Sequence, residues 1–373
     1  MPQFADIVAD RFEEWGHVPH IVRAVFPDVS AAGVASALDD FCRRQFGAGV
    51  QAPEFFEASV GSVHGLRLED GRRVVVKVHG PRTSVGFLAA VQAVQRHLAD
   101  RGFPAPVPLV GPVAFGRGRA VAETLLDTGE HADARQPPVR GAMATSLARL
   151  VRLCRGLTGL AGLRDSIMEV RGGQLWPVPH DGRFDFEATS AGAEWIDRLA
   201  AKARLVRDRH GGEEVVGHRD WREQHLRFAG GRLTAVYDWD SLCIAREPAL
   251  VGSVAHAFTA NWEVAGRLQF PSLPEALAFV SEYEDARGGQ FSVEEREALL
   301  GSFVYTMAYT ARCEHSDELT DMGRRPPRRR AVAGVPRGTA RSFLAMHACE
   351  LLGVPDDEGI PEVLPSDVRS APG

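Results

Sequence analysis

The sequence has few cysteines, and their spacing does not pair them. Only five occur among 373 residues, an odd number, and no two form a Cys-x-x-Cys pair. This pattern argues against both a disulfide framework and a zinc knuckle. The N-terminal stretch "MPQFADIVADRFEEWGH" contains acids and lacks a basic start followed by an apolar core, so it is not typical of a secretory signal. We therefore expect reduced thiols and a cytoplasmic protein.

The chain also lacks a long apolar run and a strong charge of either sign. No apolar stretch is long enough to span a bilayer. The net charge is only −6, which gives no general electrostatic reason to expect nucleic acid or an anionic membrane as a partner. The basic run "RRPPRRR" at 324–330 departs from this balance, and its two prolines favour a solvated surface loop.

The residue composition and the spacing of apolar residues change three times along the chain. Residues 1–50 show apolar residues at helical spacing, and we interpret them as a helical extension that packs on the next lobe. Residues 51–127 are β-rich, residues 128–352 are mostly helical, and residues 353–373 form a tail rich in proline and acids. The sequence therefore predicts an α+β chain with a small antiparallel lobe, a larger helical lobe and a loose tail.

The small lobe carries clear turn and helix signals. Two β-rich runs flank "EDG" at 69–71, which is a tight hairpin signal. A helix is predicted from Ser84 to Gly102, with an apolar stripe that also includes Gln95. The run "RAVAETLLDTGE" at 119–130 predicts a further strand that leaves the sheet as a hinge.

Helices dominate the predicted larger lobe. A capping box from Ser292 to Glu295 predicts that another helix begins there. An insertion rich in Gly, Pro, Trp and Asp at 164–188 is longer than a simple connector needs, and long connectors are often functional. The other predicted helices lie at about 143–163, at about 189–209 opening at Thr189 or Ser190, and at 275–286.

The stretch "GHRDWREQHLRF" at 217–228 gathers many ionisable groups just before a turn. Gly230 and Gly231 separate two apolar runs, as an antiparallel hairpin requires. The hairpin should return Asp238 close to Asp220 and His225, so that three base or ligand groups face one cavity. Phosphoryl transfer needs this chemistry, because one carboxylate orients and accepts the proton of the attacking hydroxyl while others hold magnesium.

A lysine is the second requirement for phosphoryl transfer. Lys77 interrupts the apolar strand "VVVKV" of the small lobe, where a charge is costly unless it has a partner. We interpret it as the group that meets the phosphates. The alternative is a lysine that snorkels from an edge strand.

These residues resemble the catalytic motifs of the aminoglycoside phosphotransferase and choline kinase group, small-molecule relatives of protein kinases. That family has HxDxxxxN followed by a DxD or DW(D/E) metal motif, which stand here as His218, Asp220 and His225, then "DWD" at 238–240. The resemblance spans about residues 55–315. It implies a bilobal protein-kinase-like fold, ATP or GTP and Mg²⁺ as cofactors, and a small-molecule substrate.

The resemblance also assigns roles to single residues. Asp220 would be the catalytic base, and His218 would brace the catalytic loop. Lys77 would bind the α- and β-phosphates. Three residues would hold the metal: Asp238, His225 and Asp240, although Asp240 could instead cap the next turn. The remaining nucleotide contacts would come from the loop with Ser59, Gly61 and Ser62, and from backbone groups of the hinge between Glu123 and Leu125.

Two positions depart from the family pattern. His225 stands where the family usually has asparagine, and magnesium prefers oxygen ligands whereas imidazole suits transition metals. The helix at 84–101 lacks the glutamate that kinases pair with the strand lysine, and only Gln92 and Gln95 occupy the expected face. Both departures favour the alternative of a catalytically silent nucleotide-binding relative.

Acidic residues of the larger lobe suggest a substrate class. A carboxylate-lined pocket suits a cationic acceptor with a hydroxyl, such as an aminoglycoside, an amino sugar or an amino alcohol. Exposed acids on helices are also routine, so these residues compete with a purely structural interpretation. The candidates are Asp185, Glu187, Asp197, Glu282 and Glu314.

The sequence thus favours an ATP-dependent kinase of a hydroxyl group on a small molecule, with antibiotic resistance as one possible role. A third alternative is a metal-dependent hydrolase built on His218, Asp220, His225 and Asp238. That alternative assigns no role in the reaction to Lys77 or to the β-rich lobe that carries it.

Overall fold

The computed structural model describes most of the chain, namely residues 2–170, 172–264, 267–322, 338–355 and 359–363. The basic run at 324–330 and much of the predicted tail at 353–373 lie outside these residues. Within the described part, no helix is both long enough and apolar enough to cross a membrane. All five cysteines are free thiols and are buried.

The chain divides into two compact units, and three segments of sequence contribute to each of them. Unit 1 comprises residues 1–128, 159–164 and 235–240, and unit 2 comprises residues 129–158, 165–234 and 241–373.

Unit 1 contains a five-stranded antiparallel sheet with strand order β1-β2-β3-β5-β4. Its turn between β2 and β3 is the predicted hairpin, with Gly71 at a φ of 84°. The strands are β1 (Val50–Ala58), β2 (Ser62–Leu68), β3 (Arg73–His79), β4 (Pro108–Phe115) and β5 (Gly118–Thr124). The helices are α1 (Pro2–Trp15), α2 (His20–Val25), α3 (Ala31–Phe46) and α4 (Val85–Ala99).

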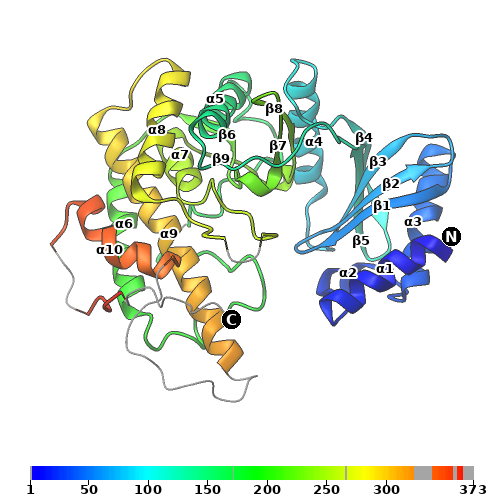
Figure 1. Cartoon of the computed structure of the whole chain (residues 1–373), viewed down its shortest axis with the longest axis horizontal. Helices are drawn as coiled ribbons and strands as arrows, with labels where there is room; N and C mark the ends of the chain where they lie inside the picture. Colours follow the sequence, from blue (N-terminus) through cyan, green and yellow to red (C-terminus); the bar gives the residue numbers. More distant parts are fainter. Residues whose placement is uncertain (1, 171, 265–266, 323–337, 356–358, 364–373) are drawn as a thin grey trace, which may run out of the picture. The chain divides into compact units, whose positions relative to one another are not determined.

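The two faces of β3 carry different side chains, one set apolar and the other including charged or polar groups. Side chains alternate across a strand, so Val74, Val76 and Val78 share one face. That face joins the apolar core built with α1, α2 and α3, which lie along one side of the sheet in Figure 1. Lys77 and His79 belong to the opposite face. Because β3 is the central strand of five and Lys77 is buried, the alternative of a lysine snorkelling from an edge strand is wrong.

Helix α4 follows the predicted pattern closely. The hydroxyl of Ser84 accepts a hydrogen bond from the Phe87 N–H and caps its first turn. Its buried residues include Leu88, Val94 and Gln95, so an amide lies within the apolar stripe. A buried amide needs hydrogen-bond partners, so the side chain of Gln95 should have a specific hydrogen-bond partner in unit 1.

The short segment 235–240 belongs to unit 1, and it contacts other residues of that unit. The Val236 N–H donates to the carbonyl of Pro104 at 3.0 Å. The Tyr237 hydroxyl donates to the Leu126 carbonyl at 2.7 Å, and the Trp239 ring meets Phe103 edge to face. These contacts fix the carboxylates that follow β8 in the same unit as Lys77.

Unit 2 is mainly helical, and its long helix α9 contacts α6, α7 and α10 (Figure 1). The helices are α5 (Pro137–Leu153), α6 (Glu194–Arg209), α7 (Glu247–Ala255), α8 (Leu273–Arg287), α9 (Val293–Met322) and α10 (Ala340–Leu352). Its short strands are β6 (Glu214–His218), β7 (Leu226–Ala229), β8 (Arg232–Val236) and β9 (Leu242–Arg246), of which β8 runs on into unit 1.

Strands β6 and β9 pair in antiparallel register and were not predicted from the sequence. Gly217 lies opposite Cys243, and His218 lies opposite Leu242. A Cβ at Gly217 would overlap the side chain of Leu250 on α7, so glycine is needed where this helix packs on the strand. The pair fixes the point at which the candidate motif that begins at His218 leaves the sheet.

Two helices differ from their predicted bounds. Helix α5 begins at Pro137 and ends at Leu153, whereas the sequence predicted about 143–163, because prolines in the first turn start a helix rather than break it. Helix α6 begins at Glu194 rather than at Thr189, whose N–H instead donates to the Asp185 carbonyl in a preceding turn. The capping box at Ser292 is confirmed, since the Ser292 and Glu295 side chains exchange hydrogen bonds with each other's backbone N–H.

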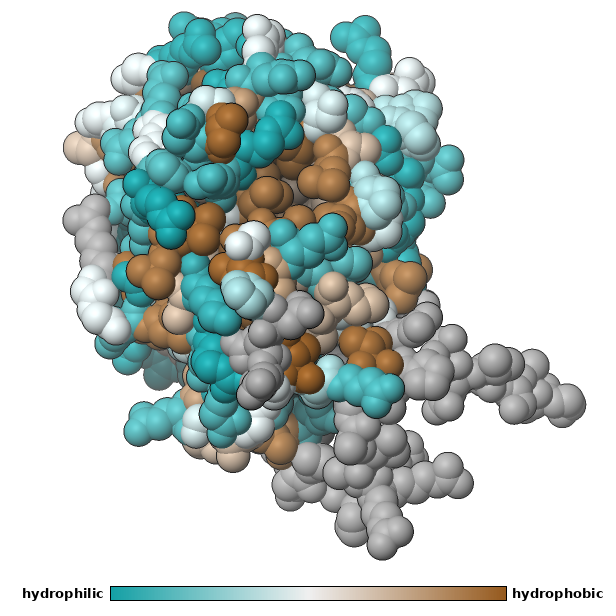
Figure 2. Space-filling view, turned by 90° about the vertical axis from the view of Figure 1, so that its left-hand side faces the viewer, coloured by the Kyte–Doolittle hydropathy of each residue, from teal (hydrophilic) through white to brown (hydrophobic). Residues whose placement is uncertain are grey.

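Apolar and polar side chains are interspersed on the surface of unit 2 that carries α6, α8 and α10 (Figure 2). Leu205, Leu277 and Met346 are the large apolar side chains that these helices expose within the described residues. Exposed apolar residues at this level are ordinary for a folded protein. With an antiparallel sheet in unit 1 and helices dominating unit 2, the predicted α+β class is confirmed.

Candidate functional site

The hairpin predicted after the stretch at 217–228 is present. Strand β6 ends at His218, Asp220 follows it, and His225 closes a short 3₁₀ turn before β7. Gly230 and Gly231 form the turn to β8 with φ values of 56° and 74°, the left-handed conformations that a tight hairpin requires. Asp238 follows β8, so the chain returns to the level of His225.

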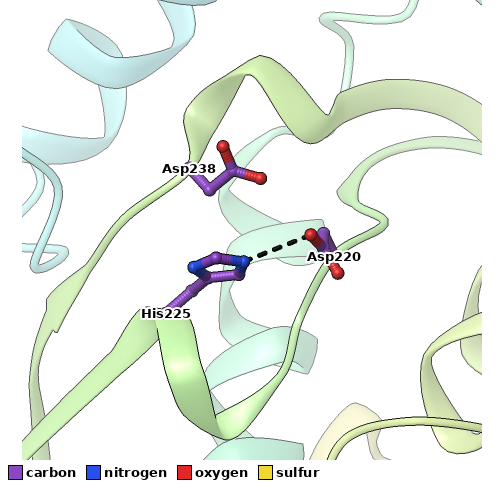
Figure 3. A group of neighbouring side chains, drawn as sticks. All are labelled: Asp220, His225 and Asp238. Atoms are coloured by element: carbon purple, nitrogen blue, oxygen red, sulfur yellow. Dashed lines mark hydrogen bonds and ion pairs between the residues drawn. The ribbon is translucent and has the colours of Figure 1, made fainter. Parts of the chain in front are cut away.

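Three side chains gather where this hairpin returns (Figure 3). Asp220, His225 and Asp238 each offer one ligand atom, and these atoms all lie within 4.8 Å of one another. The Nε2 of His225 lies 3.2 Å from the Oδ2 of Asp220. The sequence predicted this grouping. Two carboxylates and an imidazole at this spacing are a donor set that can hold a divalent cation.

Asp220 lies in a strongly positive surrounding. The Nη1 of Arg222 lies 2.9 Å from its Oδ1, and His225 lies on its other oxygen. Burial alone raises the pKa of Asp220, but the charge of Arg222 and the hydrogen bond and charge of His225 hold it well below its usual value. Asp220 is therefore an ionised acceptor at neutral pH, which is the state that a catalytic base or a metal ligand needs.

The backbone of Asp238 adopts an unusual conformation. Its φ is 58°, and it is the one non-glycine residue with a positive φ among those that the structure describes. The left-handed region costs roughly 1 kcal/mol for most residues and is tolerated best by Asn and Asp. Such a residue points to a constrained position, here the turn that directs the carboxylate toward its neighbours.

His218 occupies a buried, aromatic position. Its ring meets the Trp221 ring edge to face at 5.7 Å, and the Trp221 indole donates to the Met143 carbonyl of α5. Both side chains are buried. The pair therefore ties the loop that carries Asp220 to the body of unit 2.

Glu223 is a buried residue of this loop that the sequence did not single out. Its carboxylate accepts from the Ala134 N–H at 2.7 Å and from both terminal nitrogens of Arg267 at 2.6 and 2.7 Å. It lies three residues after Asp220 and is almost fully buried. The only sequence signal was an acid next to the motif, which is too common to indicate such a tether.

Lys77 has a carboxylate partner that comes from the sheet and not from α4. Its Nζ lies 2.9 Å from the Oε1 of Glu123 on β5, and the Gln95 amide of α4 donates to the Oε2 of Glu123 at 2.7 Å. The residues are 8%, 5% and 1% exposed. Burial opposes the charge of Lys77, but the carboxylates of Glu123, Asp240 and Asp238 outweigh it and raise the lysine pKa.

The other predicted nucleotide contacts lie in unit 1. Ser59 and Gly61 form the turn between β1 and β2, while the hydroxyl of Ser62 lies 2.8 Å from the Nε2 of His64 inside the core. The Leu125 N–H donates to the Arg73 carbonyl at 3.3 Å. Asp240 lies 3.3 Å from the Nδ1 of His79, on the face of the sheet that carries Lys77.

Most of the acids proposed for the substrate hold structural bonds in unit 2. Asp185 caps a turn through the Glu187 and Ala188 N–H groups, and Glu187 itself is exposed. Asp197 accepts from the Trp176 indole, and Glu282 forms a bidentate pair with Arg140. Glu314 accepts the first N–H groups of α10, from Ala340 and Arg341.

Known proteins resemble this chain in part of its sequence and in its fold. Residues 65–246 match the model of the Phosphotransferase enzyme family. An amicoumacin kinase in complex with AMP-PNP and Ca²⁺ superposes with a TM-score of 0.52 at 11% identity, over 82% of this chain and 90% of that one. A choline/ethanolamine kinase family protein from Mesorhizobium loti gives 0.50 at 14% identity, over 85% and 96%.

No curated protein sequence matches the chain. At these identities the two structures establish the fold alone, whereas the family match covers the strand with Lys77, the candidate motif at 217–228 and the hairpin. Together they confirm the predicted resemblance of this chain to the small-molecule phosphotransferases of the aminoglycoside phosphotransferase and choline kinase group.

Proposed function

We propose that the protein is an ATP-dependent phosphotransferase that acts on a hydroxyl group of a small molecule. The observation that carries the proposal is the grouping of Asp220, His225 and Asp238 at one end of the β7–β8 hairpin. A base and a cation-binding carboxylate next to each other are what phosphoryl transfer requires. The buried pair of Lys77 and Glu123 adds the ammonium group that meets the phosphates.

The donor set fits a divalent cation bound with the nucleotide. Asp238 and His225 would hold it, with Asp220 beside them. The cation would neutralise charge on the phosphates. An imidazole among the ligands favours Mn²⁺ or another transition metal relative to an all-oxygen set, and Mg²⁺ remains suited to the two carboxylates.

In the proposed reaction Asp220 orients the acceptor hydroxyl and takes its proton. The hydroxyl oxygen forms a bond to the γ-phosphorus, and the bond from that phosphorus to the β,γ-bridging oxygen breaks. ADP leaves with the bonding electron pair, and the products are the phosphorylated acceptor and ADP. Catalysis then comes mainly from positioning and from charge neutralisation.

For the acceptor we propose a hydroxyl-bearing amine, such as an aminoglycoside-like antibiotic, an amino sugar or an amino alcohol. Exposed Glu187 and the half-exposed Asp197 of the insertion and α6 support this choice. Because Asp197, Glu282 and Glu314 already hold structural partners, a cationic acceptor would compete with those bonds. A resistance role would follow only from activity on an antibiotic.

A second candidate is a nucleotide-binding protein without turnover. The contact of His225 with Asp220 favours it, because an imidazole N–H that donates to this oxygen would occupy the site that the acceptor proton needs. The two candidates differ in one measurable property, the release of ADP in the presence of an acceptor.

The test is an ADP-release assay with ATP over a panel of hydroxylated amines, with neutral polyols for contrast. We expect turnover with at least one amine. Asp220→Asn should abolish ADP release while ATP binding, measured by calorimetry, stays nearly intact. Unchanged turnover in this variant would remove Asp220 as the base. ATP binding without release from any acceptor would favour the second candidate.

A further inference from the structure

Lys77 on β3 is held by an arrangement that was not predicted from the sequence. The expected glutamate is missing from α4, and Gln95 occupies that face. The missing carboxylate is supplied by Glu123, which reaches Lys77 from β5. We propose that Glu123 is the positioning residue for Lys77 and that Gln95 holds Glu123 in place. This inference rests on the proposed function of the protein.

Strand register explains how the pair forms. Lys77 lies opposite Val121 and Val75 lies opposite Glu123, so Lys77 and Glu123 are diagonal neighbours on one face of the sheet. Diagonal neighbours on paired strands lie within reach of long side chains. The carboxylate therefore reaches the ammonium group without any contribution from the helix.

Charge balance explains why the helix carries an amide. One ammonium and one carboxylate are buried together, and each oxygen of Glu123 accepts one bond, from Lys77 and from Gln95. A glutamate at position 95 would place two carboxylates on a single ammonium in a buried site, which is costly. Gln95 is thus the residue that complements Glu123, and the departure from the family pattern is compensated within this chain.

The arrangement also restricts the direction of Lys77. A lysine side chain has four rotatable carbon–carbon bonds and loses much conformational freedom when it is fixed. Because the ion pair with Glu123 already restrains Lys77, this loss of side-chain entropy occurs before any ligand binds. Its loss should therefore weaken contacts with phosphates selectively and spare contacts with a nucleoside.

The experiment compares binding of AMP-PNP and of adenosine by calorimetry in the wild-type full chain and in three variants of it. Glu123→Gln should lower AMP-PNP affinity about 10- to 100-fold, the value of a charge-assisted bond, and leave adenosine affinity unchanged. Gln95→Glu adds a second carboxylate and should lower stability. The double variant combines Glu123→Gln with Gln95→Glu, so the carboxylate and the amide exchange positions. It should bind AMP-PNP more tightly than Glu123→Gln alone.

Two matched controls separate positioning from general damage. Glu54→Gln removes a carboxylate that pairs with Arg73 in the same sheet, and Gln92→Glu adds one to the same helix, where Gln92 bonds the Val110 carbonyl. Neither should change the ratio of the two affinities. An unchanged ratio in Glu123→Gln, or a double variant no better than it, would overturn the proposal.

A measurement on the wild-type chain covers the case in which a variant does not fold. The sequence contains only two lysines, Lys77 and Lys202, so ¹⁵N-lysine labelling gives two side-chain signals, which Lys202→Arg assigns. The ammonium protons of Lys77 should exchange with water more slowly than those of Lys202. Equal exchange would refute the pairing. If the wild type pairs in this way but binds no AMP-PNP, the proposed function fails and the pairing stands.

Discussion

The imidazole of His225 lies 3.2 Å from the carboxylate of Asp220, at the position that corresponds to asparagine in the family motif which this stretch resembles. Under the proposed function, His225 would change the set of ligands offered to a nucleotide-bound cation. An amide offers a hard oxygen, whereas an imidazole nitrogen suits transition metals. Under the proposed function, His225 would therefore set a preference among cations that the two carboxylates alone would not.

Replacing His225 by asparagine tests that preference. We expect wild-type protein to bind AMP-PNP more tightly with Mn²⁺ than with Mg²⁺, and His225→Asn to shift the ratio of the two affinities toward Mg²⁺ by about tenfold, as changes around metal ligands commonly do. Calorimetric titration with each cation measures the ratio. His17→Asn, at an exposed histidine of unit 1, is the control. An identical ratio in His225→Asn and wild type would show that this nitrogen does not contact the cation.

Glu223 offers a stability test of the catalytic loop. The change Glu223→Gln removes the buried partner of Arg267 and should lower the free energy of unfolding by about 3 kcal/mol, the lower end for a broken buried pair because Arg267 is partly exposed. Urea denaturation measures the change. The exposed Glu263→Gln is the matched control and should cost less than about 1 kcal/mol. Equal losses in the two variants would contradict a tethering role for Glu223.

A buried histidine predicts how stability depends on pH. Burial lowers the pKa of His64 to about 3 in the folded protein, and its ring stacks on Phe56. The unfolded chain has a histidine pKa of about 6.5. Below that pH the unfolded state binds a proton that the folded state does not, so stability falls as the pH drops from 6.5 toward 3, with a slope of up to about 1.4 kcal/mol per pH unit.

The double change His64→Phe and Ser62→Ala removes both partners of the buried hydrogen bond and should flatten this dependence. Urea denaturation at pH 7, 6 and 5 measures the slope in the variant and in wild type. The difference between them isolates His64 from the other groups that titrate in this range. Parallel slopes would show that His64 is not the group responsible.

The local parts of the candidate site could be predicted from the sequence. Gly230 and Gly231 specify a hairpin, and a hairpin fixes the neighbours of its two ends, so the grouping of Asp238 with Asp220 and His225 followed from spacing. The capping box at Ser292 was equally local. In each case the residues that decide the geometry lie within a few positions of one another.

Contacts that depend on strand register could not be predicted in the same way. Lys77 and Glu123 are 46 positions apart, and only the pairing of β3 with β5 makes them neighbours. The sequence therefore showed a lysine that needed a partner and a helix without the expected acid, but not the acid that replaces it. The tether through Glu223 depends on Arg267, which is 44 positions away in sequence.

The location of Glu123 on a strand bears on how this protein can be regulated. Enzymes that take the corresponding acid from a helix can be switched off when that helix swings outward. Here Lys77 and Glu123 belong to strands that are hydrogen-bonded to each other, so a rigid movement of α4 would break the Gln95 bond and leave the ion pair intact. If the proposed function holds, the lysine would be positioned for nucleotide whether or not α4 moves, and turnover would follow the supply of acceptor rather than an on–off signal.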